Sequence, residues 1–80
     1  MDTHITISLD CRPYVSRELD LRVPSDLTVK ELLHMLADIY GPKLAIANPY
    51  MRNLLTGEIL PSTRQLDAAK NGSLLRLEEI

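Results

Sequence analysis

The chain has 80 residues and a formal net charge of −2, with 45% hydrophobic residues, 25% charged residues and one cysteine. These values are typical of one small globular domain, residues 1–80, with a single core. The slightly acidic balance is unlike that of a nucleic-acid-binding protein, and no apolar run approaches the ~20 residues that cross a bilayer. The polar first residues are unlike a secretory signal, and a lone cysteine fits a reducing compartment. We therefore expect a cytoplasmic protein without nucleic-acid contacts or direct membrane insertion.

Two strands are predicted near the start of the chain. Over residues 5–10, apolar and polar side chains alternate with the period of two that is typical of a half-buried strand. The same alternation resumes over residues 19–23, after a loop that contains Pro13. The two segments are therefore expected to pair as a hairpin.

The clearest helix signal lies between Thr28 and Gly41. Thr28 and Glu31 have the spacing of a capping box, in which each side chain bonds a free backbone N–H of the first turn. Gly41 is expected to supply a left-handed C-cap, and Pro42 is expected to end the helix. Six residues recur at the three-and-four spacing of one apolar face and should pack on the sheet: Val29, Leu32, Leu33, Leu36, Ile39 and Tyr40.

Three further strands are predicted in the second half of the chain. Residues 50–55 have strand character, and a tight turn separates them from a short strand over residues 58–60. Leu66 is expected to fill the core. Asn71-Gly72 is typical of a turn, and the alternation over residues 74–78 predicts the last strand.

The predicted order of elements is strand, strand, helix, strand, strand, strand. In a chain of this length that order matches the β-grasp fold, an α+β fold in which a mixed sheet of four to five strands wraps one helix. The last strand of this fold runs parallel to the first, in the middle of the sheet. No repeat or linker interrupts the sequence.

Several stretches resemble ubiquitin: V-P-S-D before the helix, G-E-I-L after the third strand and S-L-L-R-L at the end. A closer resemblance is to the YukD/EsaB-like family of small ubiquitin-like proteins, which accompany the type VII (WXG100) secretion system of Gram-positive bacteria. It runs through I-T-I-S-L-D, L-D-L-R-V-P, V-K-E-L-L-H-M-L, Y-M-R-N-L-L-T-G-E-I-L and N-G-S-L-L-R-L. The resemblance implies an accessory or regulatory protein that binds the cytoplasmic parts of membrane secretion-machinery proteins. It leaves the oligomeric state open.

The last residues bear on a second function. A covalent ubiquitin-like modifier or a sulfur-carrier protein needs a flexible Gly-Gly end, because its activating enzyme admits only an unbranched backbone to a narrow channel. This sequence closes on Glu78-Glu79-Ile80 instead. We therefore expect no conjugation through the C-terminus, and a modifier or carrier activated there is the alternative function.

No constellation of reactive side chains indicates a catalytic, cofactor or metal site. Cys11 has no histidine beside it in the sequence and is expected to be inert. His4 and His34 lack the accompanying ligands of a metal site and are expected to face solvent. Three lysines are likewise expected to be ordinary surface residues: Lys30, Lys43 and Lys70. The chain is therefore expected not to be an enzyme.

Asn53 occupies a strand position where an apolar residue is expected. If Gly57 sets the register, then Met51, Asn53 and Leu55 face the core, and the Asn53 amide needs hydrogen-bond partners there. The alternative is a strand bulge that turns Leu54 inward. The sequence leaves both possibilities open.

On the first register, the face of the sheet away from the helix carries a candidate binding surface. A partner would bury its two leucines, and its two arginines would meet carboxylates of that partner. Glu78 replaces an apolar contributor to this region in ubiquitin, so receptors for ubiquitin itself are not expected to bind. Four residues should form this one exposed patch: Arg52, Leu54, Leu74 and Arg76.

Overall fold

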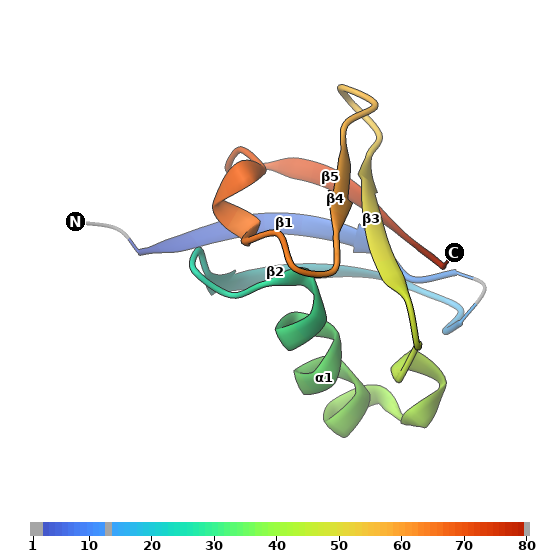
Figure 1. Cartoon of the computed structure of the whole chain (residues 1–80). Coiled ribbons are helices and arrows are strands. Elements are labelled where there is room, and N and C mark those ends of the chain that lie inside the picture. The colour runs from blue at the N-terminus through green and yellow to red at the C-terminus, as the bar shows by residue number, and fades with distance from the viewer. Residues whose placement is uncertain (1–2, 13, 80) are drawn as a thin grey trace.

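The structure, a computed structural model, describes residues 3–12 and 14–79 (Figure 1). Pro13 and Ile80, which entered the sequence predictions, lie outside the described residues. Within the described ranges, five strands form one sheet beside one α-helix and two short 3₁₀ helices. In chain order the elements are β1 (His4–Asp10), β2 (Glu18–Pro24), α1 (Val29–Tyr40), η1 (Pro42–Leu44), β3 (Pro49–Asn53), β4 (Ile59–Pro61), η2 (Leu66–Ala68) and β5 (Ser73–Glu79).

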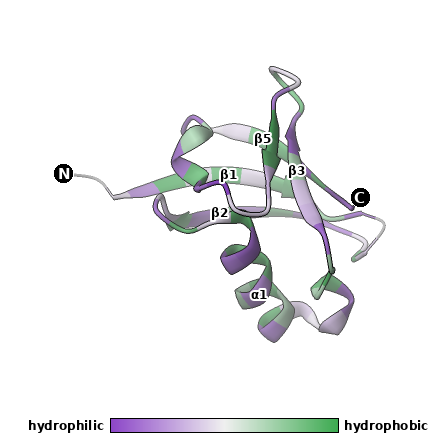
Figure 2. Ribbon diagram, viewed as in Figure 1, coloured by the Kyte–Doolittle hydropathy of each residue, from purple (hydrophilic) through white to green (hydrophobic). Residues whose placement is uncertain are grey.

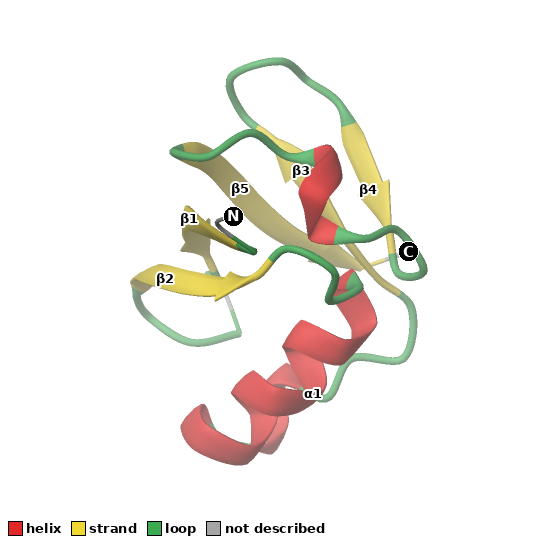
Figure 3. Ribbon diagram, turned by 90° about the vertical axis from the view of Figure 1, so that its left-hand side faces the viewer, coloured by secondary structure: helices red, strands yellow, loops and turns green. Residues whose placement is uncertain are grey.

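The strands follow one another across the sheet in the order β2-β1-β5-β3-β4. The central strands β1 and β5 are parallel, and the other neighbouring strands are antiparallel. Figures 1 and 3 show α1 on one side of this sheet. The predicted fold class is confirmed: a mixed sheet wraps one helix, and the last strand runs parallel to the first in its middle.

The start of α1 has the predicted capping box. The Thr28 Oγ1 accepts the Glu31 backbone N–H at 3.1 Å, and the Glu31 Oε1 accepts the Thr28 backbone N–H at 3.1 Å. These two bonds satisfy donors that the first turn of a helix leaves free. Figure 2 shows apolar and polar segments alternating along α1, as expected for a helix that buries one side.

The prediction that the apolar face of α1 extends to its last residues is wrong. Ile39 is 69% exposed and Tyr40 is 37% exposed, whereas the other four members of that face are buried. The helix leaves the sheet at an angle (Figure 1), so its last turn has no sheet to pack against. The guanidinium of Arg17 instead lies 5.9 Å from the centre of the Tyr40 ring, at cation–π distance.

Gly41 caps α1, with its N–H donated to the Ala37 carbonyl at 3.0 Å, but not in the left-handed conformation that was predicted. Its φ of 116° is open to glycine, but its ψ of 163° is extended and not that of a left-handed helix. Pro42 ends the helix and also begins η1, which the sequence analysis did not predict. This short turn buries Leu44 completely.

The structure resolves the alternatives for Asn53 in favour of the first register, without a bulge. Asn53 is 5% exposed, and its Oδ1 accepts the backbone N–H groups of Leu55 at 2.9 Å and Thr56 at 3.3 Å. The strand was expected to continue through Leu55, but β3 ends at Asn53 and Leu55 lies in the turn at 71% exposure. The inward position predicted for Leu55 is therefore wrong, because the Asn53 side chain turns the chain before Leu55 reaches the sheet.

The core lies between α1 and the sheet. It includes Leu66, as predicted, at the start of η2. The absence of Phe and Trp makes this core almost entirely aliphatic. The largest side chains with almost no exposure are Ile7, Leu9, Leu32, Leu44, Met51, Leu60, Leu66, Leu75, Leu77, Val29 and Cys11.

Candidate docking surface on the open face of the sheet

The face of the sheet turned away from α1, here called the open face, carries the four residues predicted to bind a partner. Arg52 on β3 and Leu74 and Arg76 on β5 alternate with the buried residues of those strands, and Leu54 directly follows the end of β3. We call the set of Arg52, Leu54, Leu74 and Arg76 the open-face cluster.

The antiparallel pairing of β3 with β5 brings the cluster together. Arg52 and Arg76 are directly opposite one another in the register. Two residues further along, the Leu54 backbone N–H donates to the Leu74 carbonyl oxygen at 2.9 Å. Both leucines are half-buried, so the cluster is a partly covered apolar pair next to two arginines and not a fully exposed patch.

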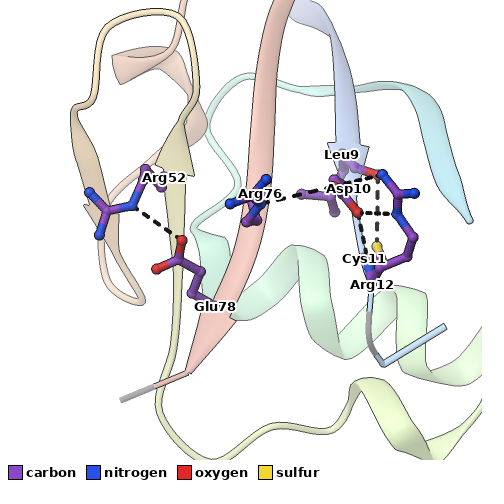
Figure 4. Close-up of polar contacts among 7 residues, drawn as sticks. All are labelled: Leu9, Asp10, Cys11, Arg12, Arg52, Arg76 and Glu78. Carbon is purple, nitrogen blue, oxygen red and sulfur yellow. Dashed lines mark hydrogen bonds and ion pairs between the residues drawn. The ribbon is translucent and has the colours of Figure 1, made fainter. Parts of the chain in front are cut away.

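Arg52 is paired within the protein. Its Nε donates to Glu78 Oε1 at 3.2 Å (Figure 4), and the Tyr50 hydroxyl donates to Glu78 Oε2. The Tyr50 and Arg52 bonds hold the pKa of Glu78 below its usual value. The same carboxylate raises the pKa of Tyr50 and of Arg52. Glu78, which was noted only as a departure from ubiquitin, is therefore the residue that anchors Arg52.

Arg76 faces a different carboxylate. Its Nε lies 3.9 Å from Asp10 Oδ2 (Figure 4), and the Asp10 side chain is only 8% exposed. Arg12 covers the same carboxylate: its Nε and Nη2 donate to the two Asp10 oxygens at 3.1 Å each, and its backbone N–H donates at 3.0 Å. The Arg12 bonds, with a smaller contribution from Arg76, hold the pKa of Asp10 below its usual value of 3.8.

These ion pairs show how the cluster is arranged before any partner binds. Each arginine, which was expected to meet carboxylates of a partner, also lies near a carboxylate of this chain. Arg52 uses its Nε for the Glu78 bond, and a guanidinium has five N–H donors in all. A partner could therefore still be bound through the outer nitrogens without breaking the internal pair.

Ile59 is an open-face residue that the sequence analysis missed. It lies on β4 directly opposite Arg52 and is 50% exposed. The signal was available, because alternation around the buried Leu60 puts Ile59 on the opposite face. Ile59 extends the apolar part of the open face towards the edge of the sheet.

The remaining sequence candidates are placed as expected. Cys11 is completely buried, and this burial raises the pKa of its thiol to about 11. His4 and His34 are exposed, and so are Lys30, Lys43 and Lys70. Among the described residues, no group of three or more His, Cys, Asp or Glu side chains could hold a metal ion.

A concave surface also lies away from the open face, beside α1. A hollow of about 510 Å³ lies between α1 and the segment that leads to β3. Its lining is mainly apolar and includes Leu33 and Ile46, with Lys30, Glu31 and His34 as polar members.

No protein-family model and no curated protein matches the chain. Solved structures do match. The ubiquitin-like domain of Arabidopsis thaliana protein At2g32350 has a TM-score of 0.67 and 15% identity, over 98% of this chain and 79% of that one. The ubiquitin of Caldiarchaeum subterraneum has a TM-score of 0.65 and 16% identity, over 96% of this chain and 94% of that one. These likenesses, together with the strand order, identify the fold as a ubiquitin-like β-grasp.

A third solved structure is a chain in protomer 1 of the ESX-3 core complex. It matches with a TM-score of 0.66 and 18% identity over 96% of this chain. The match spans only 16% of that chain, so this protein is similar to one part of a much longer polypeptide. At such identities the likeness is one of fold.

None of the helices formed by residues 3–12 and 14–79 is long and apolar enough to cross a membrane.

Proposed function

We propose that this chain is a non-enzymatic accessory or regulatory protein of type VII (WXG100) secretion, acting by protein–protein contact in the cytoplasm of Gram-positive bacteria. Its partners are the cytoplasmic parts of membrane secretion-machinery proteins. The proposal is supported by the sequence stretches that resemble the YukD/EsaB-like family. It is supported also by the fold shared with part of a chain of the ESX-3 core complex.

The observation that carries the proposal is the open-face cluster. Leu54, directly after β3, donates its backbone N–H to the carbonyl of Leu74 on β5, and both leucines are half-buried. Covering the rest of a half-buried leucine contributes about 1 kcal/mol, roughly half the value for full burial. Two leucines and Ile59 therefore provide only a few kcal/mol, which suits a reversible regulatory contact and not an obligate complex.

The ion pairs give this contact its geometry. Because the Glu78 carboxylate accepts a hydrogen bond from Arg52, the Arg52 side chain is oriented before a partner arrives, and Arg76 lies near the Asp10 carboxylate at 3.9 Å. Pre-orientation lowers the entropy that a side chain loses on binding. The partner then presents an apolar side chain to the leucines and a hydrogen-bond acceptor to the outer arginine nitrogens.

The proposal can be tested by export in the native host. In a strain that lacks the chromosomal copy, Leu54→Asp or Leu74→Asp should fail to restore secretion of small WXG100 substrates. The matched control is Leu55→Asp, because Leu55 is 71% exposed in the turn after β3 and outside the cluster. Full export by folded, normally abundant Leu54→Asp and Leu74→Asp proteins would contradict the assignment of the open face.

A further inference from the structure

The turn before β5 contains the sequence Asn71-Gly72. The Ser73 backbone N–H donates to the Lys70 carbonyl at 3.0 Å, which closes a four-residue turn. Gly72 has a φ of +86°, and no described residue other than glycine has a positive φ. This combination is that of a type II turn, with glycine at the position that requires a positive φ.

Asn71 and Gly72 each form a hydrogen bond with the backbone of Thr6 on β1. The Thr6 backbone N–H donates to the Asn71 Oδ1 at 2.6 Å, and the Gly72 backbone N–H donates to the Thr6 carbonyl at 2.7 Å. The parallel register of β1 with β5 begins at the next pair, Ile7 and Ser73. We call these two hydrogen bonds of Thr6, to Asn71 and to Gly72, the clamp. It joins the start of the paired part of β1 and β5, and Thr6 and Asn71 are 65 positions apart in the sequence.

Asparagine followed by glycine is the dipeptide most prone to deamidation, because glycine leaves the attacking nitrogen unhindered. Base removes the proton from the Gly72 nitrogen, which attacks the Asn71 Cγ. A new C–N bond forms, the bond from Cγ to the side-chain nitrogen breaks, and ammonia leaves. Water then opens the cyclic imide to aspartate or isoaspartate, so water and base are the only co-reactants.

We infer that Asn71 is a deamidation site whose reaction is blocked by the clamp on Thr6. The Gly72 N–H, whose proton must be removed for the reaction, donates a hydrogen bond to the Thr6 carbonyl. The Asn71 side chain, whose Cγ must be attacked, is held by its bond from the Thr6 N–H. Reaction therefore requires local opening of the turn, which costs free energy that a free peptide does not have to supply.

The two products differ in what they do to the fold. Aspartate keeps an oxygen that can accept the Thr6 N–H. Isoaspartate moves the main chain through the side-chain carbonyl and adds a backbone atom, so the clamp cannot re-form in the same register. Leu74 follows this turn directly in β5, so formation of isoaspartate is expected to loosen the start of that strand.

The test compares the folded protein with a blocked peptide of residues 66–76 at the same mildly alkaline pH. Deamidation is followed by mass spectrometry of the tryptic fragment 71–76, and protection of the Gly72 amide is followed by hydrogen exchange. We expect the folded protein to react more than about tenfold more slowly than the peptide, with a protected Gly72 amide, and to approach the peptide rate in denaturant. Equal rates in protein and peptide, or slow reaction with an unprotected Gly72 amide, would overturn the inference.

The variant Asn71→Asp keeps an oxygen that can accept the Thr6 N–H but has no side-chain amide to lose, so it tests the hydrogen bond without the deamidation reaction. It is expected to unfold at nearly the same temperature as the original chain, because an acceptor for Thr6 is retained, whereas Asn71→Ala should unfold at a lower temperature. If Asn71→Ala is as stable as the original chain, the Asn71 side chain contributes nothing to the clamp and the inference fails.

Discussion

Arg52 on β3 and Arg76 on β5 are directly opposite one another, and the two guanidinium groups turn to different carboxylates. Like charges at opposed positions of neighbouring strands destabilise a sheet. Here Glu78 pairs with Arg52, and Asp10, which Arg12 binds more closely, lies 3.9 Å from Arg76. The open face is therefore an ordered row of charges beside a pair of leucines, and its stability depends on the protonation of two acids.

The first prediction is that the free energy of unfolding falls at acidic pH, because protonation of Asp10 removes its stabilising contacts. The pKa of Asp10 in the folded protein lies below the usual value of 3.8. The ionised carboxylate therefore contributes its full stabilisation to the fold above pH 3.8, and this stabilisation is lost as the pH falls through the folded pKa. Asp10→Asn should lower the free energy of unfolding near neutral pH and flatten its fall in acid. The measurement is urea denaturation across this pH range.

The matched control for Asp10→Asn is Asp38→Asn on the exposed surface of α1. This control should leave the acid limb of the stability curve unchanged. An Asp10→Asn curve parallel to that of the original chain would show that the Arg12 and Arg76 contacts do not stabilise the fold.

The second prediction concerns the capping box of α1. Thr28→Ala removes the Oγ1 that accepts the Glu31 N–H and should lower the free energy of unfolding by about 1 kcal/mol. Thr63→Ala is the control, since Thr63 is exposed in the loop after β4. An unchanged denaturation midpoint for Thr28→Ala would mean that the cap contributes nothing.

The third prediction concerns the Asn53 side chain. Asn53→Ala leaves the Leu55 and Thr56 N–H groups without their acceptor and should cost about 1 to 3 kcal/mol of stability. Asn53→Asp keeps an acceptor oxygen and should cost less. Equal losses for the two variants, measured by thermal unfolding, would argue that packing and not hydrogen bonding determines the effect.

The fourth prediction is that Cys11 does not react while the protein is folded. Its side chain is completely buried and its pKa is raised to about 11, so the thiolate that attacks thiol reagents is neither formed nor accessible near neutral pH. Labelling should become complete only in denaturant. Rapid labelling of the folded protein at neutral pH would contradict this account.

Local signals in the sequence were sufficient for most of the fold. The capping box at Thr28 and the alternation of β1 and β5 each arise within a few residues, and all three are present. The exposure of Ile39 was not predictable in this way, because it depends on where the helix leaves the sheet. The position of Leu55 was missed for a similar reason: the Asn53 amide ends the strand through bonds to the following turn.

The placement of the candidate site was predictable, but its electrostatics were not. Alternation puts Arg52 and Arg76 on the open face from sequence alone. Their carboxylate partners lie elsewhere in the chain, since Asp10 reaches Arg76 only through the parallel pairing of β1 with β5. Identifying such pairs requires the register of non-adjacent segments, which no local pattern contains.

The most direct test of the proposed function is the affinity of the purified chain for the cytoplasmic segments of the secretion-machinery membrane proteins, measured by calorimetry. We expect reversible binding that Leu54→Asp or Leu74→Asp weakens by about tenfold or more, since a buried anchor commonly contributes over 1 kcal/mol. Leu55→Asp should bind like the original chain, and circular dichroism should show all three variants folded. Unchanged affinity of the folded Leu54→Asp and Leu74→Asp variants, or no binding by the original chain, would contradict the account.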